Sequence, residues 1–244
     1  MTVAATATIE HVAEVERHDP GIADAWWWLG IPLLSTLSLL VIARVAPQFY
    51  LDWILPEAYG ALEVLHVLLP AIGFIVGLLI LRLPGVRAWP LAKWAAVLFS
   101  ASCLFIAGEE CSWGQWFFYW ETPEYWGQLN RQNETNLHNT SYFFNHFLRN
   151  ILKVAVIVGG IILPLMPMQM RGPFASIPIL RMLVPPGAIV PVSLATVGFD
   201  LMASASKGGG INIFVPRPSE AVELFMYMFI LFYMVMFWRR ARLL

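Results

Sequence analysis

Acidic and imidazole side chains recur at short spacings in this chain, and a chemical site could be built from them. Glu63 and His66 stand three residues apart in an apolar run, so on a helix both would project from one face. The same Glu-x-x-His step supplies ligands in di-iron four-helix bundles, and carboxylate with imidazole suits iron, manganese or zinc. The step occurs once here, so hydrogen-bonded helix ends remain the alternative. The candidate metal ligands are Glu63, His66, Glu110, Glu134 and His138.

A second set of side chains offers acid and base chemistry. Glu109 and Glu110 end an apolar run, where a carboxylate withdrawn from water can serve as a general acid, a general base or a proton carrier. Neighbouring residues on a helix lie about 100° apart, so only one of the two is expected to face a common centre. The structural alternative is that they pair with Arg149 and Lys153 and hold two helices together. The candidate catalytic residues are Glu109, Glu110, Glu134 and His138.

The composition places these groups in a membrane protein. Of the 244 residues, 59% are hydrophobic and only 13% are charged, and the mean hydropathy is +0.66. Soluble domains carry about 25% charged residues. A formal net charge of −1 excludes nucleic acid as a partner, because such binding needs clustered Lys and Arg. Cys103 and Cys111 would lie about 12 Å apart on one helix, so no disulfide is expected between them.

Six apolar segments are candidates to span a bilayer, which takes about 20 mostly apolar residues. They cover residues 26–46, 60–82, 90–109, 147–168, 183–203 and 220–238. Pro185, Pro186 and Pro191 interrupt the fifth segment, so whether it spans fully is open. The expected fold is an all-α polytopic membrane helix bundle, with a polar N-terminal tail at 1–24 and a single transmembrane domain at 25–244.

A polar connection of unusual length joins the third and fourth segments. Its aromatic residues between 113 and 126 suit the membrane–water interface. The run Thr122-Pro123-Glu124 predicts a helix start, with Thr as the N-cap and Pro in the first turn. We therefore expect a short interfacial or re-entrant helix within 113–146 that covers the outer mouth of the bundle. If residues 134–138 are helical, Glu134 and His138 share one face of that helix.

The distribution of charge predicts the orientation of the chain. With the N-terminus in the cytoplasm, most Lys and Arg residues fall on the cytoplasmic side, as the positive-inside rule requires. All Asp and Glu residues beyond the N-terminal tail then fall on the outer side. We expect a multi-pass protein of the bacterial inner membrane with both termini cytoplasmic. Charges that lie at one depth near the outer face should pair with one another or line a wet cavity, because isolated charges in a bilayer are costly.

Three short motifs in this region resemble the signature of a family of uncharacterised bacterial multi-pass membrane proteins. They are Glu-Glu-Cys-Ser-Trp-Gly-Gln at 109–115, Trp-Glu-Thr-Pro-Glu at 120–124 and Gln-Asn-Glu-Thr-Asn-Leu-His-Asn at 132–139. The resemblance covers this region and the six-helix layout, and it implies a membrane bundle without implying an activity. Trp116 departs from the family pattern, which has a basic residue after Gly-Gln, so no charge pair is implied at this position.

Three classes of function fit these observations. The first is a membrane-embedded enzyme that acts on a lipid-like or quinone-like substrate, because acids and two histidines from several segments meet at one depth. The second is a non-catalytic subunit of a larger membrane complex, with 113–146 as the docking surface. The third is a proton or solute transporter, which the scarcity of polar residues in the inner halves of the helices disfavours. The expected partners are membrane lipids and, for the second class, other membrane proteins. The sequence does not determine a cofactor, and a divalent metal is the candidate.

Overall fold

Six long apolar helices form the bundle in the computed structural model, which describes residues 19–167, 170, 172, 177–207 and 215–243. They are η2 with α2 (Trp26–Gly30 and Ile31–Val45), α4 (Ala61–Arg82), α6 (Pro90–Glu110), α9 continued by η5 and α10 (Tyr142–Ile157, Val158–Ile162 and Leu163–Leu165), α13 (Val190–Lys207) and α14 (Pro218–Ala241). Each offers 20 to 24 residues of high hydropathy, enough to cross a hydrocarbon core. The expected all-α, multi-pass membrane bundle is confirmed, and its fifth span, Gly187–Ser206, is long enough.

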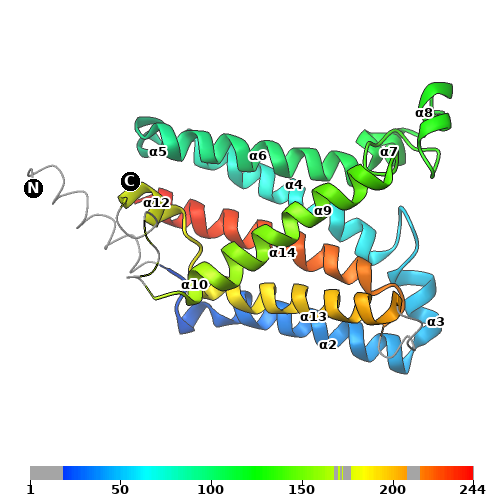
Figure 1. Ribbon diagram of the computed structural model, residues 1–244, viewed down its shortest axis with the longest axis horizontal. Coiled ribbons are helices and arrows are strands. Elements are labelled where there is room, and N and C mark those ends of the chain that lie inside the picture. The colour runs from blue at the N-terminus through cyan, green and yellow to red at the C-terminus, as the bar shows by residue number, and fades with distance from the viewer. Residues whose placement is uncertain (1–18, 168–169, 171, 173–176, 208–214, 244) are drawn as a thin grey trace, which may run out of the picture.

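Helix α14 lies at the centre of the bundle, with α4 and α13 packed against it and α6 packed on α4 (Figure 1). Its span is 67% buried, whereas the other five spans are only 11% to 33% buried. A helix that is enclosed on all sides carries apolar residues on all of its faces. Between its charged ends, α14 buries Phe, Met, Leu and Tyr side chains around its circumference. The outer helices instead leave many Leu, Ile and Val side chains exposed, as lipid-facing helices do.

Glycine allows close helix contact at two crossings. A Cβ atom on Gly77 of α4 would lie 2.0 Å from Ser100 Oγ of α6. A Cβ atom on Gly160 of η5 would lie 2.0 Å from Ser193 Oγ of α13. Small residues at such crossings let helix backbones approach in membranes, where tight packing replaces the hydrophobic effect as the source of helix association. The first contact brings α4 against α6, and the second brings η5, the continuation of α9, against α13.

Both ends of the described chain meet at one end of the bundle. Arg240 of α14 donates from Nε and Nη2 to the two carboxylate oxygens of Asp19, at 2.6 Å each. Its Nη1 donates to the backbone carbonyls of Met182 and Val184. Bidentate pairs of this kind are among the stronger and more directional polar contacts in proteins. Six spans therefore return the chain to the side on which it starts; residues 1–18 of the predicted polar tail lie outside the described residues.

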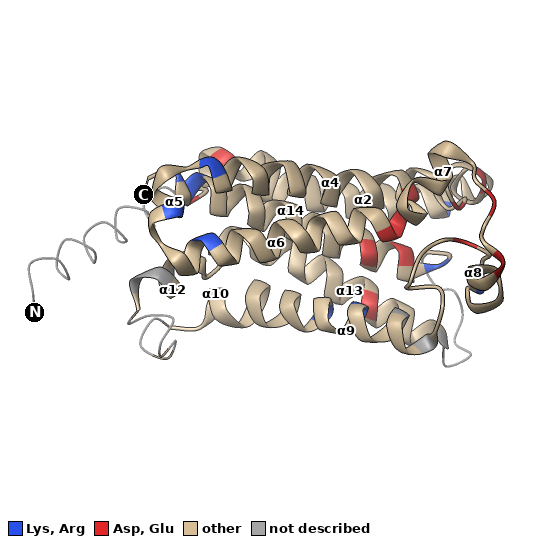
Figure 2. Cartoon of the chain, turned by 90° about the horizontal axis from the view of Figure 1, so that it is seen from above, with Lys and Arg blue, Asp and Glu red and all other residues tan. Residues whose placement is uncertain are grey.

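The opposite end of the bundle carries most of the acidic residues, near α7 and α8 (Figure 2). The connection after α6 contains η4 (Ser112–Gly114), α7 (Gln115–Phe118) and α8 (Glu124–Leu129). It thus holds two short α-helices where the sequence predicts one. Helix α8 begins at Glu124, but Pro123 rather than Thr122 is its N-cap. The Thr122 hydroxyl is taken up elsewhere, because it contacts the backbone carbonyl of Asn133.

Candidate functional site

Glu109, in the last turn of α6, anchors the loop that follows α8. Its Oε2 accepts hydrogen bonds from the backbone N–H groups of Leu137 and His138, both at 2.8 Å, and its Oε1 accepts from the Trp113 indole at 2.7 Å. The residue is only 3% exposed. Charge-assisted bonds to backbone N–H groups are strong, and both carboxylate oxygens are occupied by donors. Glu109 is therefore a structural carboxylate, although the sequence makes it a candidate catalytic residue.

The chain reverses sharply after Glu110, through three consecutive residues with positive φ of which one is glycine. Ser112, Trp113 and Gly114 have φ values of 49°, 56° and 104°, all in the left-handed region that favours glycine. The Trp113 ring folds back on α6, where a Cβ atom on Gly108 would lie 2.8 Å from it. The ring can lie there only because residue 108 lacks a side chain. The Gly-Glu-Glu-Cys-Ser-Trp-Gly run thus encodes a tight turn that brings the loop to Glu109.

The loop at 130–141 is held by its own polar side chains. Oε2 of Glu134 accepts from the Ser112 hydroxyl at 2.8 Å and from the Asn136 amide at 2.7 Å. The Asn130 amide donates to the backbone and side-chain oxygens of Asn136. These residues form turns and no helix, so the expectation that Glu134 and His138 share a helix face is wrong. Glu134 takes part in loop structure, like Glu109.

His138 lies between the loop and the second acidic group. Its Nδ1 is 3.4 Å from Oε2 of Glu109, a distance at which a protonated imidazole forms an ion pair. Burial by itself would lower the pKa of His138, but contact with Glu109 and the nearby charges of Glu110 and Glu223 together act more strongly. The pKa of this imidazole therefore lies above its ordinary value.

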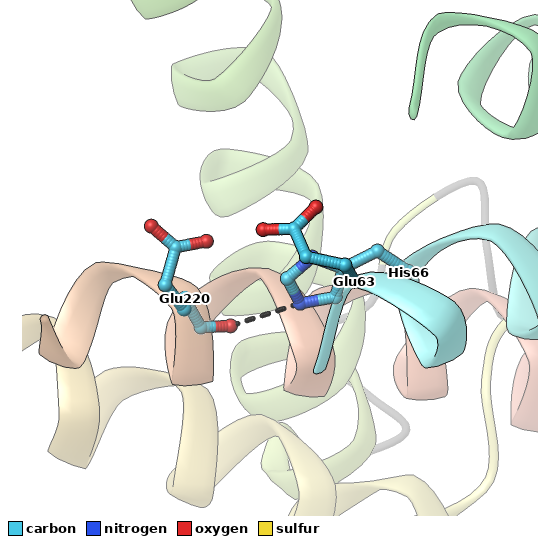
Figure 3. Close-up of side chains that lie close together, drawn as sticks. All are labelled: Glu63, His66 and Glu220. Atoms are coloured by element: carbon cyan, nitrogen blue, oxygen red, sulfur yellow. Dashed lines mark hydrogen bonds between the residues drawn. The ribbon is translucent and has the colours of Figure 1, made fainter. Parts of the chain in front are cut away.

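A second acidic group surrounds His66, and it draws on three helices. We call it the His66 cluster: Glu63 and His66 of α4, Glu110 of α6, and Glu220 and Glu223 of α14. The cluster contains two sets of possible ligand atoms, and within each set the atoms lie within 4.8 Å of one another. The first set comes from Glu63, His66 and Glu220, and the second comes from His66, Glu110 and Glu223. Figure 3 shows the first set at the junction of α4 and α14.

His66 is the centre of this cluster. Its side chain is 0% exposed, and its Nε2 lies 3.1 Å from the backbone carbonyl of Glu220. Nδ1 lies 3.9 Å from Oε2 of Glu110 and has no hydrogen-bond partner among the described residues. The ring meets Tyr227 edge-on, with centroids 5.5 Å apart, and the Tyr227 hydroxyl donates to Oε1 of Glu110 at 2.6 Å.

Arginine side chains neutralise part of the cluster from its outer edge. Arg149 of α9 lies 3.1 Å from Glu223, and Arg217 lies 2.9 Å from Glu220 and 3.6 Å from Glu57. Lys153 instead pairs with Asp200 of α13. The sequence-based alternative in which Arg149 and Lys153 pair with Glu109 and Glu110 is therefore wrong, because both cations have acidic partners on other helices.

The structure thus divides the predicted site residues between two places. Glu63, His66 and Glu110 come together, whereas Glu109, Glu134 and His138 belong to the loop network and its edge. Glu220, Glu223 and Tyr227 also belong to this arrangement, although the sequence-based prediction did not include them among the candidate site residues. The signal for the first two was present, since a Glu-x-x-Glu step opens the last apolar segment at the same membrane face. Tyr227 gave no signal, because it is one aromatic residue in an aromatic-rich helix.

Comparison of the chain with family models, with curated proteins and with solved structures finds no match at any of the three levels. The resemblance of residues 109–139 to a family signature consequently stays an expectation. The geometry of the two acidic regions is the basis for any functional assignment.

Proposed function

We propose that this protein is a membrane-embedded enzyme whose reacting groups lie in the His66 cluster and whose substrate is lipid-like or quinone-like. One observation carries the proposal: a fully buried imidazole and carboxylates from three helices lie within 4.8 Å of one another in two overlapping sets, at one end of an apolar bundle. Buried ionisable groups are costly in a membrane bundle, and those that occur usually serve a function.

Glu110 is the acid or base that we assign to the chemistry. Tyr227 occupies its Oε1, but Oε2 accepts no hydrogen bond from any described residue and faces Nδ1 of His66. The Glu110 side chain is 12% exposed and that of Glu223 is 22% exposed, so the cluster is not sealed. A carboxylate with one fixed and one available oxygen can take a proton from a bound molecule and return it. Glu109 is less suited to this role, because donors already occupy both of its oxygens.

The substrate class follows from where the cluster lies. The helices that carry it are apolar along their length, and α9 beside it exposes Phe143, Phe147 and Ile151 on its outer surface. A molecule with a polar head and an apolar tail could place its head at the cluster and its tail along such helices. Lipids and quinones have this form, whereas a small water-soluble metabolite would gain nothing from the apolar surroundings.

Mass spectrometry of lipids and quinones from bacterial membranes tests the proposal. Cells that produce the wild-type protein should change the level of at least one lipid or quinone, and cells that produce Glu110→Gln should not. Glu57→Gln is the matched control, because Glu57 is an exposed glutamate at the same end of the bundle and should behave as wild type. All three proteins must reach the membrane in equal amounts. Identical profiles for wild type and Glu110→Gln would overturn the proposal.

A second function, that of a subunit in a membrane complex, is favoured by the exposed aromatic residues around α7. Phe117, Phe118 and Tyr119 are 62%, 77% and 86% exposed, and exposed aromatic side chains are common at protein interfaces. Purification in mild detergent separates the two functions. A subunit would carry a partner at a fixed ratio that Phe118→Ser and Tyr119→Ser release. A protein that runs alone and still alters membrane lipids would contradict the subunit role.

A further inference from the structure

The tautomer of His66 is fixed by its surroundings. The Glu220 carbonyl 3.1 Å from Nε2 can only accept a hydrogen bond, so Nε2 must be the nitrogen that carries the proton. In the neutral ring, Nδ1 then presents a lone pair. A backbone carbonyl on the far nitrogen is the usual means by which proteins fix and orient a metal-binding histidine.

The lone pair of Nδ1 lies on the side of the ring that faces Glu110. Nδ1 is fully buried without a hydrogen-bond partner among the described residues, and its near neighbour is Oε2 of Glu110 at 3.9 Å. A lone pair and an ionised carboxylate repel each other unless a proton, a water molecule or a metal cation lies between them. The separation is too long for a hydrogen bond. It does match two ligand atoms of one metal ion, which lie about 3–4 Å apart when each bond is about 2.0–2.2 Å long.

The charges of the cluster favour the binding of a cation. Glu63, Glu110, Glu220 and Glu223 supply four carboxylates, whereas two guanidinium groups contact them, from Arg149 and Arg217. Arg217 is also shared with Glu57, so ionised carboxylates outnumber the cations among the described residues. A bound divalent cation would offset this excess and lower the cost of burying it.

We propose that His66 Nδ1, Glu110 and Glu223 bind one divalent transition-metal ion, of the manganese, iron or zinc type. One imidazole with two carboxylates suits these metals, whereas magnesium and calcium take oxygen ligands. The three side chains already offer ligand atoms within 4.8 Å of one another. The site keeps Glu110 and His66 of the sequence-based metal prediction, adds Glu223, and leaves out Glu63, Glu134 and His138. It goes beyond the proposed function, since a subunit could also hold a structural metal.

Manganese titration of the purified protein tests the site. The full chain is purified in mild detergent with a peptide tag that binds no metal, stripped with a chelator, and titrated with Mn²⁺ while the paramagnetic resonance signal of free Mn²⁺ is followed. We expect one ion to bind per chain, and zinc to displace it. No binding by the stripped wild-type protein would overturn the site, because the cluster would then be balanced by protons.

Variants assign the ligands. Loss of an outer-shell partner weakens metal affinity by about 10- to 100-fold, so His66→Ala and Glu223→Gln should each weaken it by at least about tenfold. Asp200→Asn is the matched control: its carboxylate also lies within the bundle but pairs with Lys153, and the variant should bind as wild type does. If His66→Ala does not fold, Glu223→Gln alone decides. Unchanged Mn²⁺ affinity in Glu223→Gln would overturn the assignment. If the wild-type protein binds Mn²⁺ but does not change the lipid or quinone profile of the cells, the enzyme proposal fails and the metal site remains.

Discussion

Glu109 and Glu110 are neighbours on one helix, yet they lie in surroundings of opposite character. Glu109 meets three N–H donors and holds the 130–141 loop, so its charge is matched by the groups around it. Glu110 meets one hydroxyl, the unprotonated side of a histidine and further acids. Glu109, whose two oxygens both accept hydrogen bonds, stabilises the fold. Glu110, which has one oxygen without a hydrogen-bond donor among the described residues, is available for a ligand. The two residues differ in direction by about 100° around the helix axis, and this difference places them in separate surroundings. Their adjacent positions in the sequence do not show which one faces which surroundings.

The largest expected effect is a difference in stability between glutamine substitutions at Glu109 and at Glu110. In metal-stripped protein, Glu109→Gln should lower the free energy of unfolding by about 2–4 kcal/mol, because it weakens the bonds of a buried carboxylate to three N–H donors. Glu110→Gln should change it by less than about 1 kcal/mol, because the Gln oxygen still accepts from Tyr227, the hydrogen bond that the structure gives Glu110 among the described residues.

Thermal unfolding of both variants in the same detergent measures the difference. Tyr227→Phe serves as a control for loss of the hydroxyl alone. Equal destabilisation by the two glutamine substitutions would show that Glu110 is as structural as Glu109, and the comparison between them would fail.

An intermediate effect is expected from the loop. Glu134→Ala leaves the Ser112 hydroxyl and the Asn136 amide without their shared acceptor, which should cost about 1–3 kcal/mol of stability. The folded fraction should bind Mn²⁺ with wild-type affinity, because neither set of candidate ligands includes Glu134. Thermal unfolding and the Mn²⁺ titration give the two values. Loss of metal binding with unchanged stability would move Glu134 from the loop network to the site.

The smallest effect is a dependence on pH that His138 confers. The pKa of His138 is raised in the folded protein, so the stability that its charge contributes is complete below its ordinary pKa of 6.5 and is lost as the pH rises through the raised value. The groups that face it are Glu109, Glu110 and Glu223.

Melting temperatures of the wild type and of His138→Asn between about pH 6 and pH 9 isolate this term, since other titrating groups cancel in the difference. The wild-type advantage should shrink as the pH rises and should amount to less than about 1 kcal/mol at its largest, because the contact is partly open to solvent. An advantage that grows with pH would mean that His138 stabilises the loop as a neutral ring.

The candidate site was only partly predictable from the sequence. Glu63 and His66 share a helix face because they stand three residues apart, and this local spacing could be read directly. Their partners on α14 could not be assigned, because the sequence does not fix which face of a central helix turns toward α4. Glu134 and His138 were misplaced because their helical spacing does not by itself make a helix, and the 130–141 loop is stabilised by side-chain contacts with Ser112 and Glu109.

The sequence by itself determined the membrane bundle, its six spans and the gathering of acids at one end, because apolar length and charge distribution act locally along the chain. Only the tertiary structure decided which acids meet and which are already satisfied. That outcome depends on helix rotation and on distant contacts, such as Tyr227 with Glu110 and the Glu220 carbonyl with His66. Such contacts join residues more than a hundred positions apart, and no local pattern specifies them.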